Sequence, residues 1–147
     1  MSHDSSNIDN AIVAMLGADA TLLSASPNGV YFDVAPEHST RFVIVSLLES
    51  NDESVFGGRA YEEYLYLVKA VQRSTEPNTI KAAAARIDVL LDDQPLGVGS
   101  PLSVAGYTFM ACFRESRIRQ TEVDPNDASI LWHHRGGLYR VQMCVNP

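Results

Sequence analysis

Two long segments in the middle of the chain alternate in a way that is typical of β-strands. Residues 41–49 and 60–72 place apolar side chains on both sides of an extended backbone. In the first segment Phe42, Ile44 and Leu48 oppose Val43, Val45 and Leu47, and in the second Tyr64, Tyr66, Val68 and Ala70 oppose Leu65, Leu67, Lys69 and Val71. Because both sides are apolar, we expect central strands with a layer on each face.

Polar residues separate these strands from each other and from shorter ones. Residues 50–59 contain Gly57 and Gly58, which predicts a long hairpin loop. Shorter strands are predicted over 30–34, 106–117 and 138–145. Residues 116–136 are rich in charged and turn-forming side chains, so a second long loop is predicted there, interrupted by an apolar group at 130–132.

Helices are predicted before and after the two long strands. Apolar residues spaced by three and four between Ile80 and Leu91 indicate a helix with one core-facing stripe, and Thr75 with Pro77 is its expected start. A first helix is expected over 7–16, ended by Gly17, and a short second helix over 19–25 with Asp19 as its cap.

This order of elements predicts an α+β fold with a mostly antiparallel sheet of four to five strands and helices packed on one face. The length of 147 residues suits a single domain spanning 1–147. One helical layer covers one face of a sheet, so the second apolar face is expected to need a partner.

Composition adds little to this prediction but excludes several classes of protein. A hydrophobic content of 46% indicates a folded chain, and a net charge of −7 argues against tight nonspecific binding of nucleic acid. Cys112 and Cys144 lie in apolar segments and are expected to be buried thiols. The polar, acidic first ten residues and the lack of any apolar run near ~20 residues predict a soluble protein made in a cytoplasm.

No pattern of residues predicts a catalytic, cofactor-binding or metal site. His133 and His134 are adjacent, and neighbours on a strand point to opposite faces, so they cannot readily share one ion. Glu62 and Glu63 diverge for the same reason. A small hydrolase that uses His133 or His134 stays open as an alternative to a non-enzymatic protein.

A basic group lies near the end of the predicted strand 106–117. Strict alternation puts Tyr107, Phe109, Ala111 and Phe113 on one face, and it separates Arg114 from Arg117 and Arg119. Since Glu115 and Glu122 flank the arginines, we expect the salt-bridged rim of a protein interface rather than a phosphate site.

Over most of its length the chain resembles the tail terminator, or tail completion, proteins of long-tailed bacteriophages. The resemblance lies in the order and character of segments, with no catalytic signature. These segments are ADATLL (18–23), GVYFDVAPEHSTRFVIVSL (29–47), FGGRAYEEYLYLVKAV (56–71), IKAAAARIDVLLDD (80–93) and WHHRGGLYRVQMCV (132–145). The longer segment 116–136 departs from short members of the family.

The resemblance implies a structural virion protein without cofactors. Its relatives form a hexameric ring at the head-proximal end of the tail tube, end tube polymerisation and dock the tail to the head connector. The implied partners are copies of the chain, the tail tube protein and the connector or stopper protein, with DNA only as passing cargo and no membrane. The implied location is the virion, after a period in the host cytoplasm.

Five residues are candidates for the interface, because tryptophan and arginine often carry interface energy and long loops can reach neighbours. They are Phe56, Arg59, Arg117, Arg119 and Trp132. A head-side neck or stopper protein of the connector is the alternative that the sequence does not separate from a tail terminator.

Overall fold

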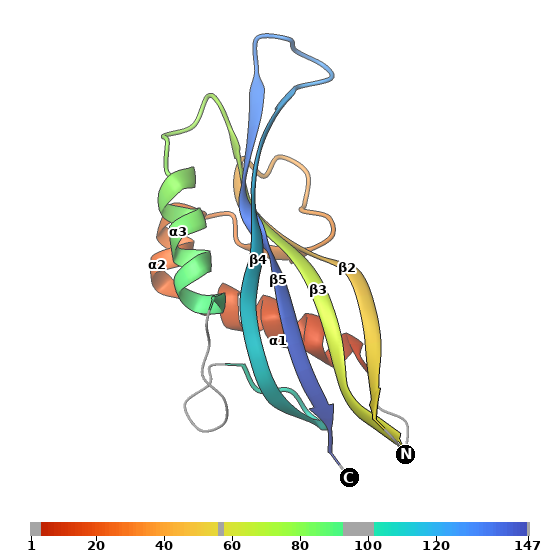
Figure 1. Cartoon of the computed structure of the whole chain (residues 1–147). Helices are drawn as coiled ribbons and strands as arrows, with labels where there is room; N and C mark the ends of the chain where they lie inside the picture. Colours follow the sequence, from red (N-terminus) through yellow and green to blue (C-terminus); the bar gives the residue numbers. More distant parts are fainter. Residues whose placement is uncertain (1–3, 56–57, 93–101, 147) are drawn as a thin grey trace.

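The computed structural model describes residues 4–55, 58–92 and 102–146, with side chains described outside 53–60. Its elements are α1 (Ser6–Gly17), α2 (Ala20–Ala25), β1 (Val30–Phe32), β2 (Arg41–Val55), β3 (Gly58–Arg73), α3 (Ile80–Leu91), β4 (Tyr107–Val123) and β5 (Leu131–Val145). The strands form one sheet in the order β1-β2-β3-β5-β4, and Figure 1 labels β2 to β5 of it. Among the described strands, β1 alone pairs in parallel, with β2. The predicted α+β class is confirmed.

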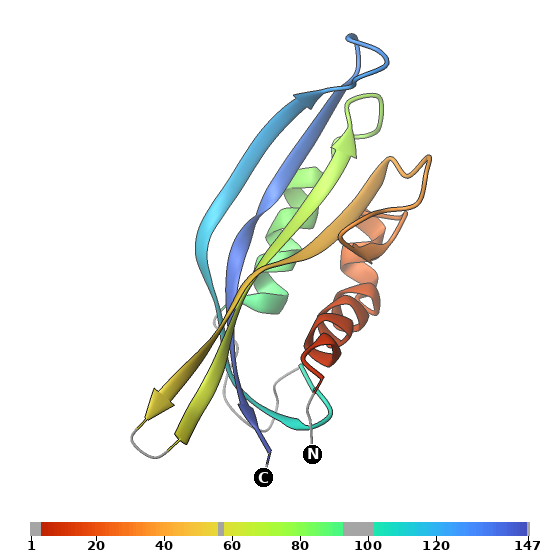
Figure 2. The same cartoon turned by 90° about the vertical axis from the view of Figure 1, so that its right-hand side faces the viewer.

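The predicted loop over 50–59 is wrong, because β2 and β3 continue through it as a paired ladder. Ser50, Asn51 and Asp52 lie opposite Tyr64, Glu63 and Glu62, and pairing extends to Val55 opposite Gly58. Polar residues can form a strand where cross-strand backbone bonds hold the chain, since strand propensity depends strongly on context. The two long strands therefore make a projecting hairpin arm at one end of the sheet (Figure 2).

The predicted loop over 116–136 is also wrong for most of its length. β4 runs on to Val123 and β5 begins at Leu131, so that residues 124–130 alone connect them. The Asp124 carboxylate accepts hydrogen bonds from the backbone N–H groups of Asn126 and Asp127 and from the Trp132 indole N–H, the last at 2.8 Å. This hairpin projects at the end of the sheet opposite to the first arm (Figure 2).

Two irregularities in β4 overturn the alternation predicted for it. The register shifts between Phe109 and Ala111, and again between Arg114 and Ser116. Each shift changes which side chains face the helices. As a result Tyr107, Phe109 and Cys112 join the core, whereas Phe113 does not. The same shifts place Arg114, Arg117 and Arg119 on the helical side, where separation had been predicted.

All three helices pack on one face of the sheet (Figures 1 and 2). The core between the layers consists mainly of Ile8, Ile12, Leu16, Leu22, Ala83, Ile87 and Leu91 from the helices, against Val43, Val45, Tyr64, Tyr66, Val68, Tyr139, Val141 and Met143 from the strands. The predicted helix near 80–91 is confirmed, but its start is not Thr75. The helix begins at Ile80, after Thr79, and the Thr79 backbone N–H donates a hydrogen bond to the Gln72 side chain. Residues 74–79 therefore belong to the connection between β3 and α3.

Charged side chains tie the helices to each other and to the sheet. Asp19 caps α2 as predicted, accepting the backbone N–H of Leu22 at 2.9 Å, and it also receives two hydrogen bonds from the Arg86 guanidinium of α3, at 2.7 and 2.8 Å. The buried Tyr66 hydroxyl donates to Asp9 of α1, and the Tyr139 hydroxyl donates to Asp88 of α3. These bonds satisfy polar groups that burial would otherwise leave without partners.

Candidate assembly surfaces

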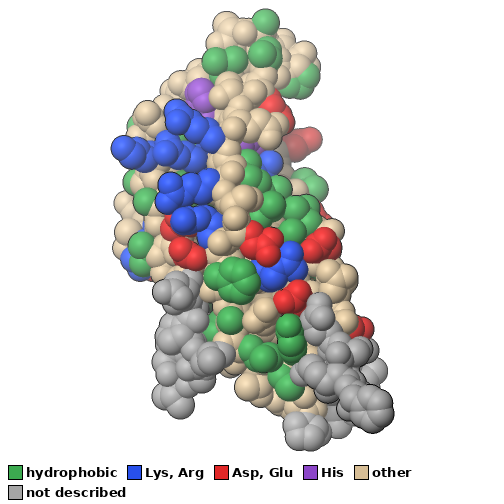
Figure 3. Space-filling view, in the orientation of Figure 1, with side chains coloured by type: hydrophobic (Ala, Val, Ile, Leu, Met, Phe, Trp, Pro, Cys, Tyr) green, Lys and Arg blue, Asp and Glu red, His purple; other side chains and the backbone are tan. Residues whose placement is uncertain are grey.

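The sheet has a second apolar face, which we call the open face because none of the described helices packs on it. It is formed by side chains that alternate with those of the core. Its apolar members are Phe42, Ile44, Leu65, Leu67, Val71, Ala111, Phe113, Ile118, Trp132 and Leu138. Ile44, Leu65 and Val71 are buried yet lie outside the core cluster, and Leu67 and Leu138 are half-buried opposite each other. Figure 3 shows apolar surface on this side of the molecule.

Trp132 anchors one end of the open face. Its ring packs against Phe42 with the centroids 6.4 Å apart. Between these rings and the segment 33–39 lies a hollow of about 480 Å³, lined also by Ile44, Leu67 and Val71. The hollow leaves apolar side chains of the open face accessible to a partner.

Arg140 is the charged centre of the open face. Its guanidinium lies 3.1 Å from Glu49 and 3.4 Å from Glu63, and it also donates to Glu115. The hydrogen bond from Arg140 lowers the pKa of Glu115 below its usual value. One cation on β5 thus joins three other strands, β2, β3 and β4, and the group keeps an excess of negative charge on this face (Figure 3).

His134 lies on the open face beside the hollow and is buried. Neither ring nitrogen makes a hydrogen bond to a described residue, although Glu122 Oε2 lies 3.4 Å from Nε2. Burial lowers the pKa of His134, as do Lys69 and His133, while Glu122 opposes the shift. The ring is therefore neutral near pH 7. His133 points to the other face, as predicted for neighbours on a strand, and lies opposite Thr121.

The structure separates the five predicted interface residues. Phe56 lies outside the described residues, and of Arg59 only the backbone is described, paired with Ser54. Trp132 lies on the open face, whereas Arg117 and Arg119 lie on the helical side. Their role at an interface stays a prediction.

The predicted salt-bridged rim is wrong for these two arginines in the described part of the chain. Glu115 pairs with Arg140, and Glu122 lies beside His134, both on the open face. The sequence interpretation also missed Arg140, and nothing in its immediate surroundings in the sequence signals the role. Its three carboxylates come from positions 25 to 91 residues away.

Among the described residues, no three His, Cys, Asp or Glu side chains converge as metal ligands. Cys112 and Cys144 form no disulfide, and burial raises the pKa of the Cys112 thiol to about 12, which keeps it protonated. No described helix has the length and apolar character needed to cross a membrane.

Comparisons with known proteins show a shared fold. No protein-family model matches the sequence, and no curated protein does. Among solved structures, a chain from the virion of a native gene transfer agent particle superposes with a TM-score of 0.65 at 18% identity, covering 97% of this chain and 98% of that one. A second solved chain, whose name states no function, gives a TM-score of 0.59 at 10% identity over 99% of both chains.

Proposed function

We propose that this chain is a structural virion protein that forms a ring at the head-proximal end of a phage-type tail tube. In this role it ends tube polymerisation and docks the tail to the connector or stopper protein on the head side. The observation that carries the proposal is the apolar open face, which the helices leave uncovered. The end-to-end likeness in fold to a chain of a gene transfer agent virion supports a particle component.

Burial of the open face favours association with another copy. Leu67, Phe113 and Leu138 are half-buried in the single chain, and covering such side chains contributes about 25 cal/mol per Å² of apolar surface. Large apolar patches on soluble proteins are usually interaction sites. Arg140 and its carboxylates lie within the same face and supply polar contacts that define one orientation of the partner.

The edges of the sheet favour a ring over a closed pair. β4, with 17 residues, forms one edge. At the other edge the three residues of β1 cover only a small part of β2. A head-to-tail contact joins two different surfaces of each copy, and it closes into a ring when the rotation is right. Neighbouring copies then cover edges that would otherwise invite uncontrolled pairing.

Within this proposal the protein is non-enzymatic and acts through its surfaces. The ring is a homo-oligomer, a hexamer by the family resemblance, and its neighbours are the tail tube protein and the connector or stopper protein. It resides in the virion after synthesis in the host cytoplasm. DNA passes through the lumen as cargo, and the net charge of −7 limits adhesion to the ring as a whole.

Electron microscopy tests both parts of the proposal. The purified chain should form rings of uniform diameter. In particles that contain the chain, a gold label on an added affinity tag should mark the junction of tail and head. A label on the tube side of the junction identifies a terminator, and one on the head side identifies a neck or stopper protein instead. Single chains at every concentration, together with label elsewhere in the particle, would contradict the proposal.

A further inference from the structure

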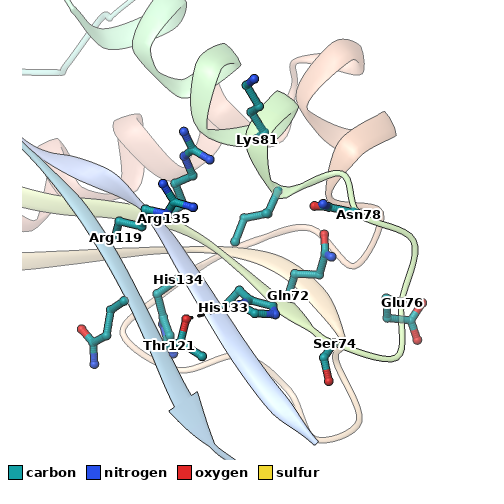
Figure 4. Close-up of a pocket in the computed structure, with 12 residues that line it drawn as sticks. Gln72, Ser74, Glu76, Asn78, Lys81, Arg119, Thr121, His133, His134 and Arg135 are labelled. Carbon is teal, nitrogen blue, oxygen red and sulfur yellow. Dashed lines mark hydrogen bonds between the residues drawn. The ribbon is translucent and has the colours of Figure 1, made fainter.

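Four basic side chains lie together on the helical side of the sheet, around the C-terminal half of β4. Lys81 comes from α3, Arg117 and Arg119 from β4, and Arg135 from β5, and we call them the basic trough. Figure 3 shows the blue side chains gathered on the flank where β4 and α3 lie. In Figure 4 the side chains of Arg119 and Arg135 extend side by side toward α3.

The trough concentrates positive charge that the described residues do not neutralise. Arg119 lies directly opposite Arg135 in the β4–β5 ladder, and like charges at such positions repel each other. No described residue makes a hydrogen bond or ion pair with any of the four side chains. By contrast, Arg41, Arg73, Arg86, Arg114 and Arg140 each pair with a carboxylate.

The surface of the trough is hollowed, with polar donors along it. A hollow of about 430 Å³ is lined by Lys81, Arg119 and Arg135 together with Ser74, Asn78 and Thr121 (Figure 4). A second hollow of about 190 Å³ shares Lys81 and Arg135 and adds Arg117. Because Lys81 and Arg135 line both hollows, the two hollows lie next to each other.

The carboxylates that border these hollows are already engaged. Glu76 in the larger hollow lies 3.7 Å from Arg41 and 3.6 Å from Arg73. Asp88 in the smaller hollow pairs with Arg114 and accepts from the Tyr139 hydroxyl. The first turn of α3, beside the trough, carries no acidic residue. Among the described residues, the two adjacent hollows therefore present uncompensated positive charge to an anion that extends across both.

We infer that the basic trough binds the phosphate backbone of duplex DNA without reading its sequence. Arginine guanidinium groups match phosphate oxygens in geometry, and contacts of this kind position a duplex without specifying bases. On a second copy of the chain, Asp19, Asp88 and Glu115 are already paired internally, whereas every phosphate along a duplex carries a negative charge.

The inference deepens the proposed function but does not depend on ring formation. If the ring assembles as proposed, a weak site on each copy guides a passing duplex while the acidic remainder of the protein repels it. Binding through few phosphates is weak and strongly dependent on salt, which permits movement along the duplex.

Fluorescence anisotropy with a labelled duplex of random sequence tests the inference at salt concentrations from about 50 to 200 mM. The wild-type chain should bind at low salt and weaken steeply as salt rises. The R119Q/R135Q double variant should lose affinity by on the order of tenfold, and the slope of log K against log salt should become shallower by about 1.8, or 0.9 for each lost contact. Since it removes a repulsive pair, its melting temperature should not fall.

Lys69→Gln is the control, because it also removes one positive charge but lies on the open face. Compared with it, Arg119→Gln should lose more affinity. Equal DNA affinity for the wild type and the double variant would overturn the inference, as would no binding by the wild type at the lowest salt. If the double variant changes the mass of the assembly but not DNA affinity, the trough contacts another copy and the inference is wrong. Rings that fail to bind DNA would leave the proposed function standing.

Discussion

Gly136 of β5 lies directly opposite Lys69 of β3, at a separation that leaves no room for a side chain. A Cβ atom on Gly136 would lie 2.5 Å from the Lys69 Cα and 2.1 Å from the carbonyl oxygen of Val68. Both neighbours are backbone atoms in the middle of the sheet, so neither can move without disturbing the ladder. The contact fixes how closely the β4–β5 hairpin approaches the rest of the sheet.

Gly136→Ala should therefore destabilise the fold. Forcing atoms into a packed site typically costs 1–3 kcal/mol, and we expect a loss of at least about 2 kcal/mol in the free energy of unfolding because the clash is with backbone. Urea unfolding followed by circular dichroism measures it. Gly17→Ala is the control, since no atom lies within 4 Å of a Cβ there and alanine favours a helix. A Gly136→Ala variant as stable as the Gly17→Ala variant would contradict this view of the sheet.

Arg140→Gln should destabilise the chain by removing the cation that three carboxylates share. Glu49, Glu63 and Glu115 would then face each other without compensation, at an expected cost of about 1–3 kcal/mol. The measurement is urea unfolding at pH 7, with Lys69→Gln as a control that removes a charge from the same face. Adding Glu115→Gln to Arg140→Gln should recover part of the loss, and no recovery would argue against repulsion as its cause.

Asp19→Ala should cost about 1–2 kcal/mol, because one carboxylate serves both as the cap of α2 and as the partner of Arg86. Asp19→Asn separates the two roles, since an amide oxygen still caps the helix but carries no charge. We expect its unfolding free energy to lie between those of the wild type and the alanine variant. If asparagine and alanine destabilise equally, the cap contributes nothing measurable.

The free energy of unfolding should fall as the pH is lowered, because His134 is buried in its neutral form. Its pKa in the folded chain lies below the usual value of 6.5, mainly because the ring is buried. Below pH 6.5 the histidine of the unfolded chain takes up a proton more readily than His134 of the folded chain. The free energy of unfolding therefore declines as the pH drops below about 6.5, and this histidine does not affect it at higher pH.

Unfolding by urea at several pH values between 5.5 and 7.5 measures this effect. His134→Gln should show a smaller decline than the wild type, whereas His133→Gln should retain the wild-type decline because His134 is still present. Parallel pH profiles for His134→Gln and the wild type would show that another group is responsible.

Sequence alone predicted the fold class, the core stripe of α3 and the two apolar faces of the central strands. The alternation of Tyr64 and Tyr66 with Leu65 and Leu67 made the faces readable, because residues on a regular strand follow a period of two. The same argument placed His133 and His134 on opposite faces.

The extent of the hairpins and the faces of β4 could not be predicted. Ser50 and Asp52 have polar side chains that suit a loop, and only their pairing with Tyr64 and Glu62 makes them strand residues. A register shift, such as that between Arg114 and Ser116, leaves no recognisable trace in a single sequence and reverses the face of every later residue. For this reason the grouping of Arg117 and Arg119 with Lys81 and Arg135 required the structure.

The mass of the purified chain in solution, measured by native mass spectrometry and light scattering over a range of concentrations, tests the central claim most directly. If a second copy covers the open face, the wild type should form one defined oligomer. Leu67→Lys, which places a charge at the centre of that face, should remain a folded single chain. Val89→Lys, at a position 62% exposed on α3, should assemble as the wild type does. A wild-type chain that stays single at every concentration, or a Leu67→Lys variant that assembles normally, would contradict the account.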